Sequence, residues 1–275
     1  MSRIKQCFET LKANNQKALI SYVTAGDPHP SKSLEIMHAL VEAGTDIIEL
    51  GVPFSDPMAD GPVIQLACER ALKHGTSLND VIDIVKQFRQ TNTSTPVVLM
   101  GYQNPIEIFG VENFAKTVSG LVDGVITVDL PPEESDQTDE IFEAENIDTI
   151  YLLAPTTREQ RIKMIADRAS GFLYYVSFKG ITGANQLDVS SVEKKVAEIG
   201  QHTQLPIAVG FGIKDAETAG LVSTCSDAVV VGSAIVSILA EHGEEDMING
   251  LSKAKLLLRD IKNALDNSAS IQNIA

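Results

Sequence analysis

The chain has 275 residues, of which 44% are hydrophobic, and its formal net charge of −15 comes from 37 acidic and 22 basic residues. This balance excludes a basic nucleic-acid-binding surface, and it means that an anionic ligand would have to be held by local backbone dipoles. The three cysteines show neither pairing nor metal-ligand spacing, which predicts free thiols, no metal and a cytoplasmic location. The sequence has no basic and apolar leader and no apolar run long enough to span a membrane, which predicts no membrane segment.

Short apolar strands alternate with helical segments along the chain. An amphipathic helix over residues 4–13 is followed by the first predicted strand at 17–24. Further strands are predicted at 46–50, 96–102, 123–128, 148–153, 171–177, 206–209 and 227–231. Helices are predicted at 31–43, 62–73, 78–90, 111–119, 134–145, 158–167, 189–199, 214–222, 233–240 and 246–265.

Eight strand–helix units without a break in composition predict a single domain, spanning residues 1–275, with the fold of a (β/α)8 TIM barrel. The strands are β-branched and apolar nearly throughout, as expected for parallel strands that are covered on both faces. The barrel would carry an extra N-terminal helix and extra helices after strands two and eight. The alternative is a doubly wound sheet, but the glycine-rich turn that this fold places after its first strand is missing.

The stretch from Glu49 to Pro62 joins the second strand to the following helix, and it holds two carboxylates. Glu49 ends an apolar strand, where a buried charge is costly without a partner, and Asp60 lies just before the helix start. Three prolines and two glycines fix the shape of this stretch. We predict that both carboxylates face one cavity and share acid–base work; the alternative is a helix-capping Asp60 and a Glu49 paired with a basic residue.

In a barrel the reactive groups lie at the C-terminal ends of the strands, and further polar residues of this sequence occur at such positions. Tyr102 and Asn104 come after the third strand, and Asp129 comes after the fourth. Along the sixth strand, the alternation of side chains predicts that Phe172, Tyr174 and Val176 point to the barrel interior. There they would form either part of the cavity wall or ordinary core packing.

Glycine-rich turns end the last two strands, which run into Gly210-Phe211-Gly212-Ile213 and Gly232-Ser233-Ala234-Ile235. These are the positions of the recurrent phosphate site of barrels, where backbone N–H groups and a helix dipole meet the oxygens. We therefore expect a phosphorylated ligand. The long polar segment 178–190 is expected to be a mobile lid, or else a simple surface connection.

Together these stretches resemble the tryptophan synthase alpha chain family over essentially the whole chain. The most specific motif is ELGVPFSDPMADGPVIQ from Glu49; the others are TAGDP from Thr24, GITGA from Gly180, GFGI from Gly210 and VGSAI from Val231. The resemblance implies retro-aldol cleavage of indole-3-glycerol phosphate to indole and glyceraldehyde 3-phosphate. It also implies no cofactor in this chain and a beta chain partner that carries pyridoxal phosphate, receives the indole and completes an alpha2beta2 tetramer.

The resemblance assigns roles to individual residues. It makes Glu49 the acid–base group at indole C3 and at the side-chain hydroxyl, Asp60 the acceptor of the indole N–H, and Thr182 the lid residue that closes onto Asp60. The phosphate-binding positions are Gly183, Gly212, Gly232 and Ser233. The indole-pocket positions are Tyr22, Met100, Ile126, Val128, Leu152, Tyr174, Val176 and Phe211. The positions that meet the beta chain are Pro53, Asp56, Pro57, Asn104 and Pro131.

Three residues depart from the family pattern. Tyr22 stands where phenylalanine is expected, so its hydroxyl needs a partner, while Phe178 and Lys179 bear on affinity and lid kinetics. Two other interpretations stay open. Lys179 is a candidate for a Schiff-base lysine of the aldolase kind, and the barrel is a candidate for a non-catalytic protein that only activates a partner enzyme.

Overall fold

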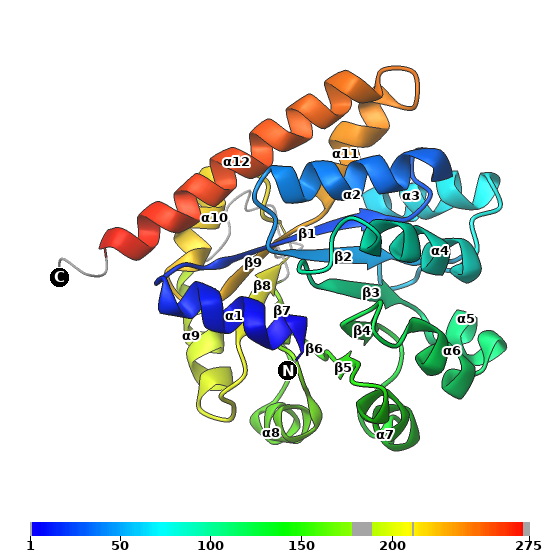
Figure 1. Cartoon of the computed structure of the whole chain (residues 1–275). Helices are drawn as coiled ribbons and strands as arrows, with labels where there is room; N and C mark the ends of the chain where they lie inside the picture. Colours follow the sequence, from blue (N-terminus) through cyan, green and yellow to red (C-terminus); the bar gives the residue numbers. More distant parts are fainter. Residues whose placement is uncertain (1, 178–188, 211, 272–275) are drawn as a thin grey trace.

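One curled sheet of nine parallel strands forms the centre of the molecule (Figure 1). The computed structural model describes residues 2–177, 189–210 and 212–271, with side chains described up to residue 267. Within these residues the strands are β1 (Ala18–Thr24), β2 (Ile47–Gly51), β3 (Val97–Gly101), β4 (Gly124–Thr127), β5 (Asp148–Thr149), β6 (Leu152–Leu153), β7 (Leu173–Val176), β8 (Ile207–Gly210) and β9 (Ala228–Val231). Their order in the sheet is β5-β4-β3-β2-β1-β9-β8-β7-β6.

The predicted fifth strand is present as two short strands, β5 and β6, at the two ends of this order. β5 pairs with β4, and β6 pairs with β7. Between them, the Ile150 N–H donates to the Val125 carbonyl oxygen at 3.0 Å, and the Tyr174 N–H donates to the Tyr151 carbonyl oxygen at 3.1 Å. One continuous segment therefore joins the two ends of the sheet, which closes as the predicted barrel.

Apolar side chains fill the barrel interior. Every residue of β1, β2, β8 and β9 is buried, as parallel strands covered on both faces require. The interior cluster includes Ile20, Val98, Ile126 and Phe172, and the apolar face of α1 (Arg3–Ala13) packs onto it through Ile4, Phe8 and Leu11. The N-terminal helix thus covers the N-terminal end of the barrel and leaves the C-terminal end for a site.

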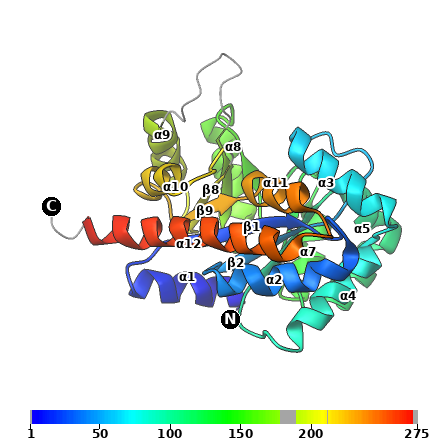
Figure 2. The ribbon, with the colours of Figure 1, turned by 90° about the horizontal axis from the view of Figure 1, so that it is seen from above.

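Helices surround the barrel (Figure 1), and the view from above looks onto one side of this ring (Figure 2). They are α2 (Ser33–Glu42), α3 (Pro62–Lys73), α4 (Leu78–Arg89), α5 (Gln103–Phe109), α6 (Val111–Val118), α7 (Asp136–Ala144), α8 (Glu159–Arg168), α9 (Val189–Gly200), α10 (Ala216–Ser223), α11 (Ser233–His242) and α12 (Met247–Ile271). The extra helices predicted after strands two and eight are present as the pairs α3–α4 and α11–α12. In the part of the chain that the structure describes, no helix is both long and apolar enough to span a membrane.

The helix α5 is one that the sequence pattern does not predict. Its Pro105 suggests a turn, but this proline lies in the first helical turn, where a backbone N–H has no intrahelical partner to lose. Gly110 ends the helix with φ of 85°, a left-handed conformation that glycine adopts without strain. The residues after β3 are therefore held in a helix rather than in an open loop.

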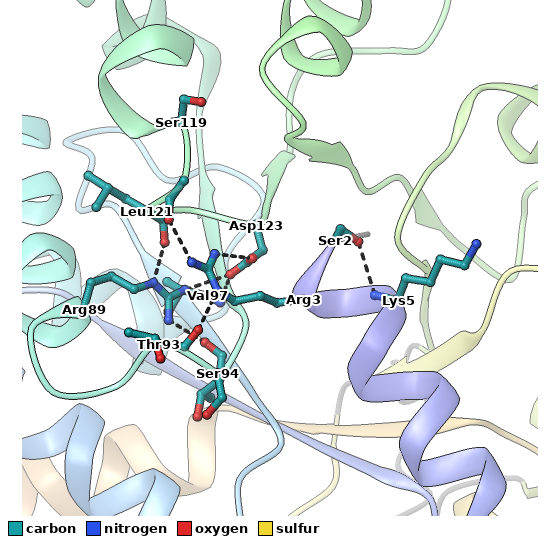
Figure 3. A network of polar contacts seen from close by, with 12 residues as sticks. Ser2, Arg3, Lys5, Arg89, Thr93, Ser94, Val97, Ser119, Leu121 and Asp123 are labelled. Atoms are coloured by element: carbon teal, nitrogen blue, oxygen red, sulfur yellow. Dashed lines mark hydrogen bonds and ion pairs between the residues drawn. The ribbon is translucent and has the colours of Figure 1, made fainter.

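A polar network fastens α1 to the N-terminal end of the barrel (Figure 3). Asp123, whose side chain is 4% exposed, accepts from Arg3 Nη1 at 2.9 Å through one carboxylate oxygen and from Arg89 Nη2 at 2.8 Å through the other. The second oxygen also accepts from the Val97 N–H at 2.8 Å. Arg89 donates further to the Leu121 and Thr95 carbonyl oxygens, so the network joins α1, α4 and the residues before β3 and β4.

Candidate active site

A cavity of about 480 Å³ opens at the C-terminal ends of the strands. Eleven of the residues singled out from the sequence line it: Tyr22, Glu49, Asp60, Met100, Val128, Leu152, Tyr174, Val176, Gly212, Gly232 and Ser233. A second hollow, of about 930 Å³, lies beside α1 at the opposite end of the barrel and holds none of the predicted residues. The structure thus brings most of the predicted site into one place.

Some predicted residues lie elsewhere. Ile126 is fully buried in the interior cluster and does not line the cavity. Thr182, Gly183 and Phe211 lie outside the described residues, as do Phe178 and Lys179. Sequence reasoning missed Val63 and Ile64, in the first turn of α3, and Ala154 and Thr157 after β6, all of which line the cavity. The signal for the first pair was its place in the first turn of the predicted helix 62–73, which begins two residues after Asp60.

Glu49 projects into an almost dry environment. It lies on β2 beside Tyr22 of β1 and Val98 of β3, and it is 1% exposed. Its Oε1 has no hydrogen-bond partner among the described residues. Burial, with a smaller contribution from the charge of Asp60, raises the pKa of Glu49 to about 8. At neutral pH this carboxyl group therefore holds a proton that it can donate.

Asp60 has a more polar environment, although it lies in the same cavity. Burial raises the pKa of Asp60, while the phenol of Tyr102, which donates to Asp60 Oδ2 at 2.8 Å, works in the opposite direction. Gln65 Nε2 donates to the Asp60 carbonyl oxygen at 2.9 Å and fixes the backbone at the start of α3. Two carboxylates with different surroundings can take different protonation states and so divide the roles of acid and base.

The cavity wall between the carboxylates is apolar and aromatic. Tyr22 and Tyr174 lie on it, together with Met100, Val128, Leu152 and Val176. The hydroxyl of Tyr22, for which the sequence predicted a hydrogen-bond partner, shares a hydrogen bond of 3.1 Å with Thr24 Oγ1. This wall suits a flat apolar ring rather than a sugar.

Glycines and a helix start form the other end of the cavity. Gly212 adopts φ of 84°, and Gly232 precedes α11, which begins at Ser233. No lysine or arginine is among the described residues that line the cavity. Backbone N–H groups and the positive end of the α11 dipole are therefore the groups available to hold an anion.

Neither a metal site nor a disulfide is found in the described part of the chain, where no cluster of histidine, cysteine, aspartate or glutamate could hold an ion and all three cysteines are free. The residues predicted to meet a partner follow three neighbouring strands, in the loops after β2 and β4 and in α5 after β3. Asp56 and Asn104 are exposed, Pro57 and Pro131 are half-buried, and Pro53 is buried. Two exposed apolar side chains that sequence reasoning missed lie in the same segments: Met58, 80% exposed, in the loop after β2, and Ile108, 81% exposed, in α5.

Comparisons with known proteins agree over almost the full chain. A family model described as "Tryptophan synthase alpha chain" matches residues 8–266. Curated relatives of that name include one from Thioalkalivibrio sulfidiphilus, 58% identical with 97% of this chain and 100% of the relative covered, and one from Marinobacter nauticus, 56% identical with 98% and 100% covered.

Solved structures give the same result. The tryptophan synthase subunit alpha from Legionella pneumophila superimposes with a TM-score of 0.90 at 44% identity, covering 97% of this chain and 99% of that one. A chain of the aminoacrylate-bound tryptophan synthase from M. tuberculosis gives a TM-score of 0.85 at 32% identity, covering 96% and 100%.

Proposed function

Because the chain belongs to the tryptophan synthase alpha chain family, we propose that Glu49 and Asp60 divide the acid–base work of that family's reaction. The enzyme is a lyase that cleaves indole-3-glycerol phosphate to indole and glyceraldehyde 3-phosphate in tryptophan biosynthesis. It has no cofactor of its own; pyridoxal phosphate is carried by the beta chain, which receives the indole. The observation that carries the proposal is the pair of carboxylates in one apolar cavity, one of them protonated at neutral pH.

Glu49 begins the reaction as an acid. Its proton goes to C3 of the indole ring, which gives an indolenine-like cation with the positive charge at the ring nitrogen. The resulting carboxylate then removes the proton of the glycerol hydroxyl next to C3. As the aldehyde forms, the bond between C3 and the side chain breaks and its electron pair returns to the ring. Indole leaves, and Glu49 is protonated again for the next cycle.

Asp60 acts on the same intermediate from the ring nitrogen. An ionised carboxylate that accepts the indole N–H hydrogen bond stabilises the positive charge that appears there after protonation at C3. This interaction is stronger in the transition state than in the ground state, which is the condition for it to accelerate the reaction. The hydrogen bond from Tyr102 supports this role, because it favours the ionised form of Asp60.

The two ends of the substrate have matching surroundings. Tyr22, Met100, Val128, Leu152, Tyr174 and Val176 would surround the indole ring, with Phe211 as a further pocket position. Ile126 would support this wall from the interior cluster, against which four of these side chains pack. Gly212, Gly232 and Ser233 would hold the phosphate by backbone N–H groups at the start of α11, with Gly183 from the segment after β7. Thr182 would close the site onto Asp60.

The family has a beta chain partner, and we propose an alpha2beta2 tetramer in which Pro53, Asp56, Pro57, Asn104 and Pro131 face it. Two exposed apolar side chains lie beside these positions: Met58 directly follows Pro57, and Ile108 lies one helical turn after Asn104 in α5. Methionine in particular is enriched at protein–protein interfaces, which supports this assignment. We also propose a single domain and a cytoplasmic location. One sheet with one interior supports the first, and free thiols support the second.

The deciding experiment measures indole release from indole-3-glycerol phosphate by the purified chain, alone and with a beta chain. We expect slow release that rises with the partner. Asp60→Asn should lower kcat by about two to four orders of magnitude, the range for a positioned acid–base group. If Asp60→Asn keeps more than about half of the activity, another group does its work. No indole in either condition, with ligand binding still detectable, would favour a barrel that only activates its partner.

A further inference from the structure

Tyr102 is a buried phenol that contacts Asp60 but has no direct part in the proton transfers of the reaction. It follows β3 directly, is 3% exposed, and is not among the residues that line the cavity. Its hydroxyl makes two hydrogen bonds: it donates to Asp60 Oδ2 at 2.8 Å and accepts from the Ala59 N–H at 2.9 Å. One phenol oxygen therefore holds both the carboxylate of Asp60 and the backbone of the residue before it.

The phenol itself is fixed from several sides. Its ring stacks on Phe54, with ring centroids 5.0 Å apart and planes inclined by 26°. Tyr102 is also the residue that precedes α5, and the N–H of Gln103, the first residue of that helix, donates to Asp129 Oδ1 at 2.8 Å. Because β3 and α5 hold the backbone and Phe54 holds the ring, the hydroxyl has one well-defined position.

Asp60 has a backbone held by Pro57 and Gln65, but its carboxylate lacks such support from its own segment. It lies between β2 and α3, outside regular structure, and its carboxylate has two rotatable bonds. The titratable groups that face it are Glu49 from β2, Tyr22 from β1, Cys68 from α3 and Tyr102 after β3. Among the described residues, Tyr102 supplies the hydrogen bond to this carboxylate, and it bonds one oxygen only.

We propose that Tyr102 is a positioning residue for the alpha reaction: it fixes the carboxylate of Asp60 through Oδ2 and leaves Oδ1 for the substrate N–H. The inference rests on the proposed role of Asp60. Its physical basis is that a hydrogen bond to a charged acceptor is among the stronger ones in proteins, and that a small displacement of a reacting group is costly in rate. The donated O–H also favours the ionised carboxylate, which is the form that accepts the indole N–H.

The chain offers a matched control. Tyr151 is a second buried tyrosine that donates to an aspartate, Asp139 Oδ2, at 2.6 Å, and its hydroxyl also lies 2.5 Å from Ser135 Oγ. None of these three residues lines the cavity. Tyr151→Phe therefore removes the same chemistry from the same fold at a place where no effect on the reaction is expected.

The experiment compares Tyr102→Phe, Tyr151→Phe, Asp60→Asn and the double variant of Tyr102→Phe with Asp60→Asn, each in complex with the beta chain, by the pH dependence of indole release. Tyr102→Phe should lower kcat about tenfold with KM changed less than about twofold, as expected when a hydrogen bond to a charged group that matters in the transition state is lost. The acid limb of the kcat/KM profile should move to higher pH, because the ionised form of Asp60 loses its donor. Tyr151→Phe should leave both kcat and the acid limb unchanged.

Further comparisons separate the two levels of inference. In the double variant, the loss should be no larger than in Asp60→Asn alone, because Tyr102 acts through Asp60. If Asp60→Asn inactivates the enzyme but Tyr102→Phe keeps its kcat and its acid limb, the positioning role is wrong while the proposed function stands. If Asp60→Asn stays active, the proposed function itself fails.

A second variant covers the case in which Tyr102→Phe does not fold. Phe54→Leu removes the stacked ring but keeps the hydroxyl of Tyr102, and it should lower kcat in the isolated chain in the same direction by a smaller factor. An unchanged kcat in Phe54→Leu would overturn the positioning role.

Discussion

At the scale of single residues, the site depends on two carboxylates whose environments differ. Glu49 is buried with one oxygen unpartnered, whereas Asp60 accepts a phenol hydrogen bond. The sequence predicted that both face one cavity. A glutamate at the end of an apolar strand is buried at a cost in free energy unless it has a partner, and the aspartate lies in a constrained loop next to that strand. The sequence could not predict Tyr102 as the partner, because that contact joins residues 42 positions apart and depends on how two loops pack.

The raised pKa of Glu49 has a consequence for stability. The unfolded chain binds fewer protons at this residue than the folded chain between the ordinary glutamate pKa of 4.5 and the folded value of about 8, so stability falls as pH rises through this range. We expect Glu49→Gln, which keeps the shape and removes the titration, to raise the Tm relative to the wild type at pH 8 to 9 and to change it little near pH 4 to 5. Thermal unfolding at several pH values measures this; a shift that is the same at every pH would contradict it.

Tyr22 and Gly51 pack so closely that the position of the Tyr22 ring depends on the missing Cβ of the glycine. A Cβ placed on Gly51 would lie 2.2 Å from the Tyr22 hydroxyl oxygen and 2.7 Å from Cζ, which is closer than atoms can approach. Gly51→Ala should therefore displace the ring into the cavity, raise KM about tenfold and lower stability by about 1 to 3 kcal/mol.

The matched control is Gly200→Ala, where a Cβ would have its nearest neighbour at 4.0 Å. Combining Gly51→Ala with Tyr22→Leu should restore stability in part, because the clash is removed. Kinetics and chemical denaturation of these variants test the pair, and equal effects of Gly51→Ala in both backgrounds would show that the ring is not what Gly51 accommodates.

At the scale of elements, the hydrophobic periodicity and the glycines and prolines between segments predicted the barrel, the helix pairs after strands two and eight, and the N-terminal helix. The errors have local causes. Pro105 concealed α5, because a proline in the first turn of a helix looks the same in sequence as a turn. The last helix runs to Ile271 rather than 265, since no glycine or proline follows to end it. The division of the fifth strand depends on its two neighbours and has no signal in its own residues.

The fastening of α1 is testable at this scale. Asp123 and Arg89 are buried and Arg3 is partly exposed, so Asp123→Asn would leave two guanidinium groups without their anion, one of them inside the protein. We expect a loss of about 3 kcal/mol in the free energy of unfolding, the size typical of breaking a buried pair from one side.

The exposed pair of Lys86 and Asp83 gives the comparison, since Asp83→Asn should change stability by less than about 0.5 kcal/mol. Urea denaturation of both variants measures the difference. Equal effects would mean that the network in Figure 3 contributes no more than a surface pair.

At the scale of the whole molecule, a net charge of −15 surrounds a cavity whose described lining has no lysine or arginine. A phosphate held by backbone groups at short range is screened little by salt, whereas long-range attraction to surface lysines would be lost as ionic strength rises. We expect KM for indole-3-glycerol phosphate to change less than about twofold between 50 and 300 mM salt. Steady-state kinetics over this range test the expectation, and a steep rise of KM with salt would point to a cationic group outside the described lining.

The barrel closes at the divided fifth strand, which is its most weakly paired segment. β5 and β6 each contribute two residues and each pair on one side only, whereas β1 has seven residues and is paired on both sides by β2 and β9. The ring is thus strongest opposite the place where it closes, and the first and last strands of the chain are bonded to each other there. A break of the backbone near residue 150 would leave two complementary pieces that still share the parallel pairing of β1 with β9. The region around residue 150 is therefore the natural place to divide this protein for reassembly from fragments or to give it new termini.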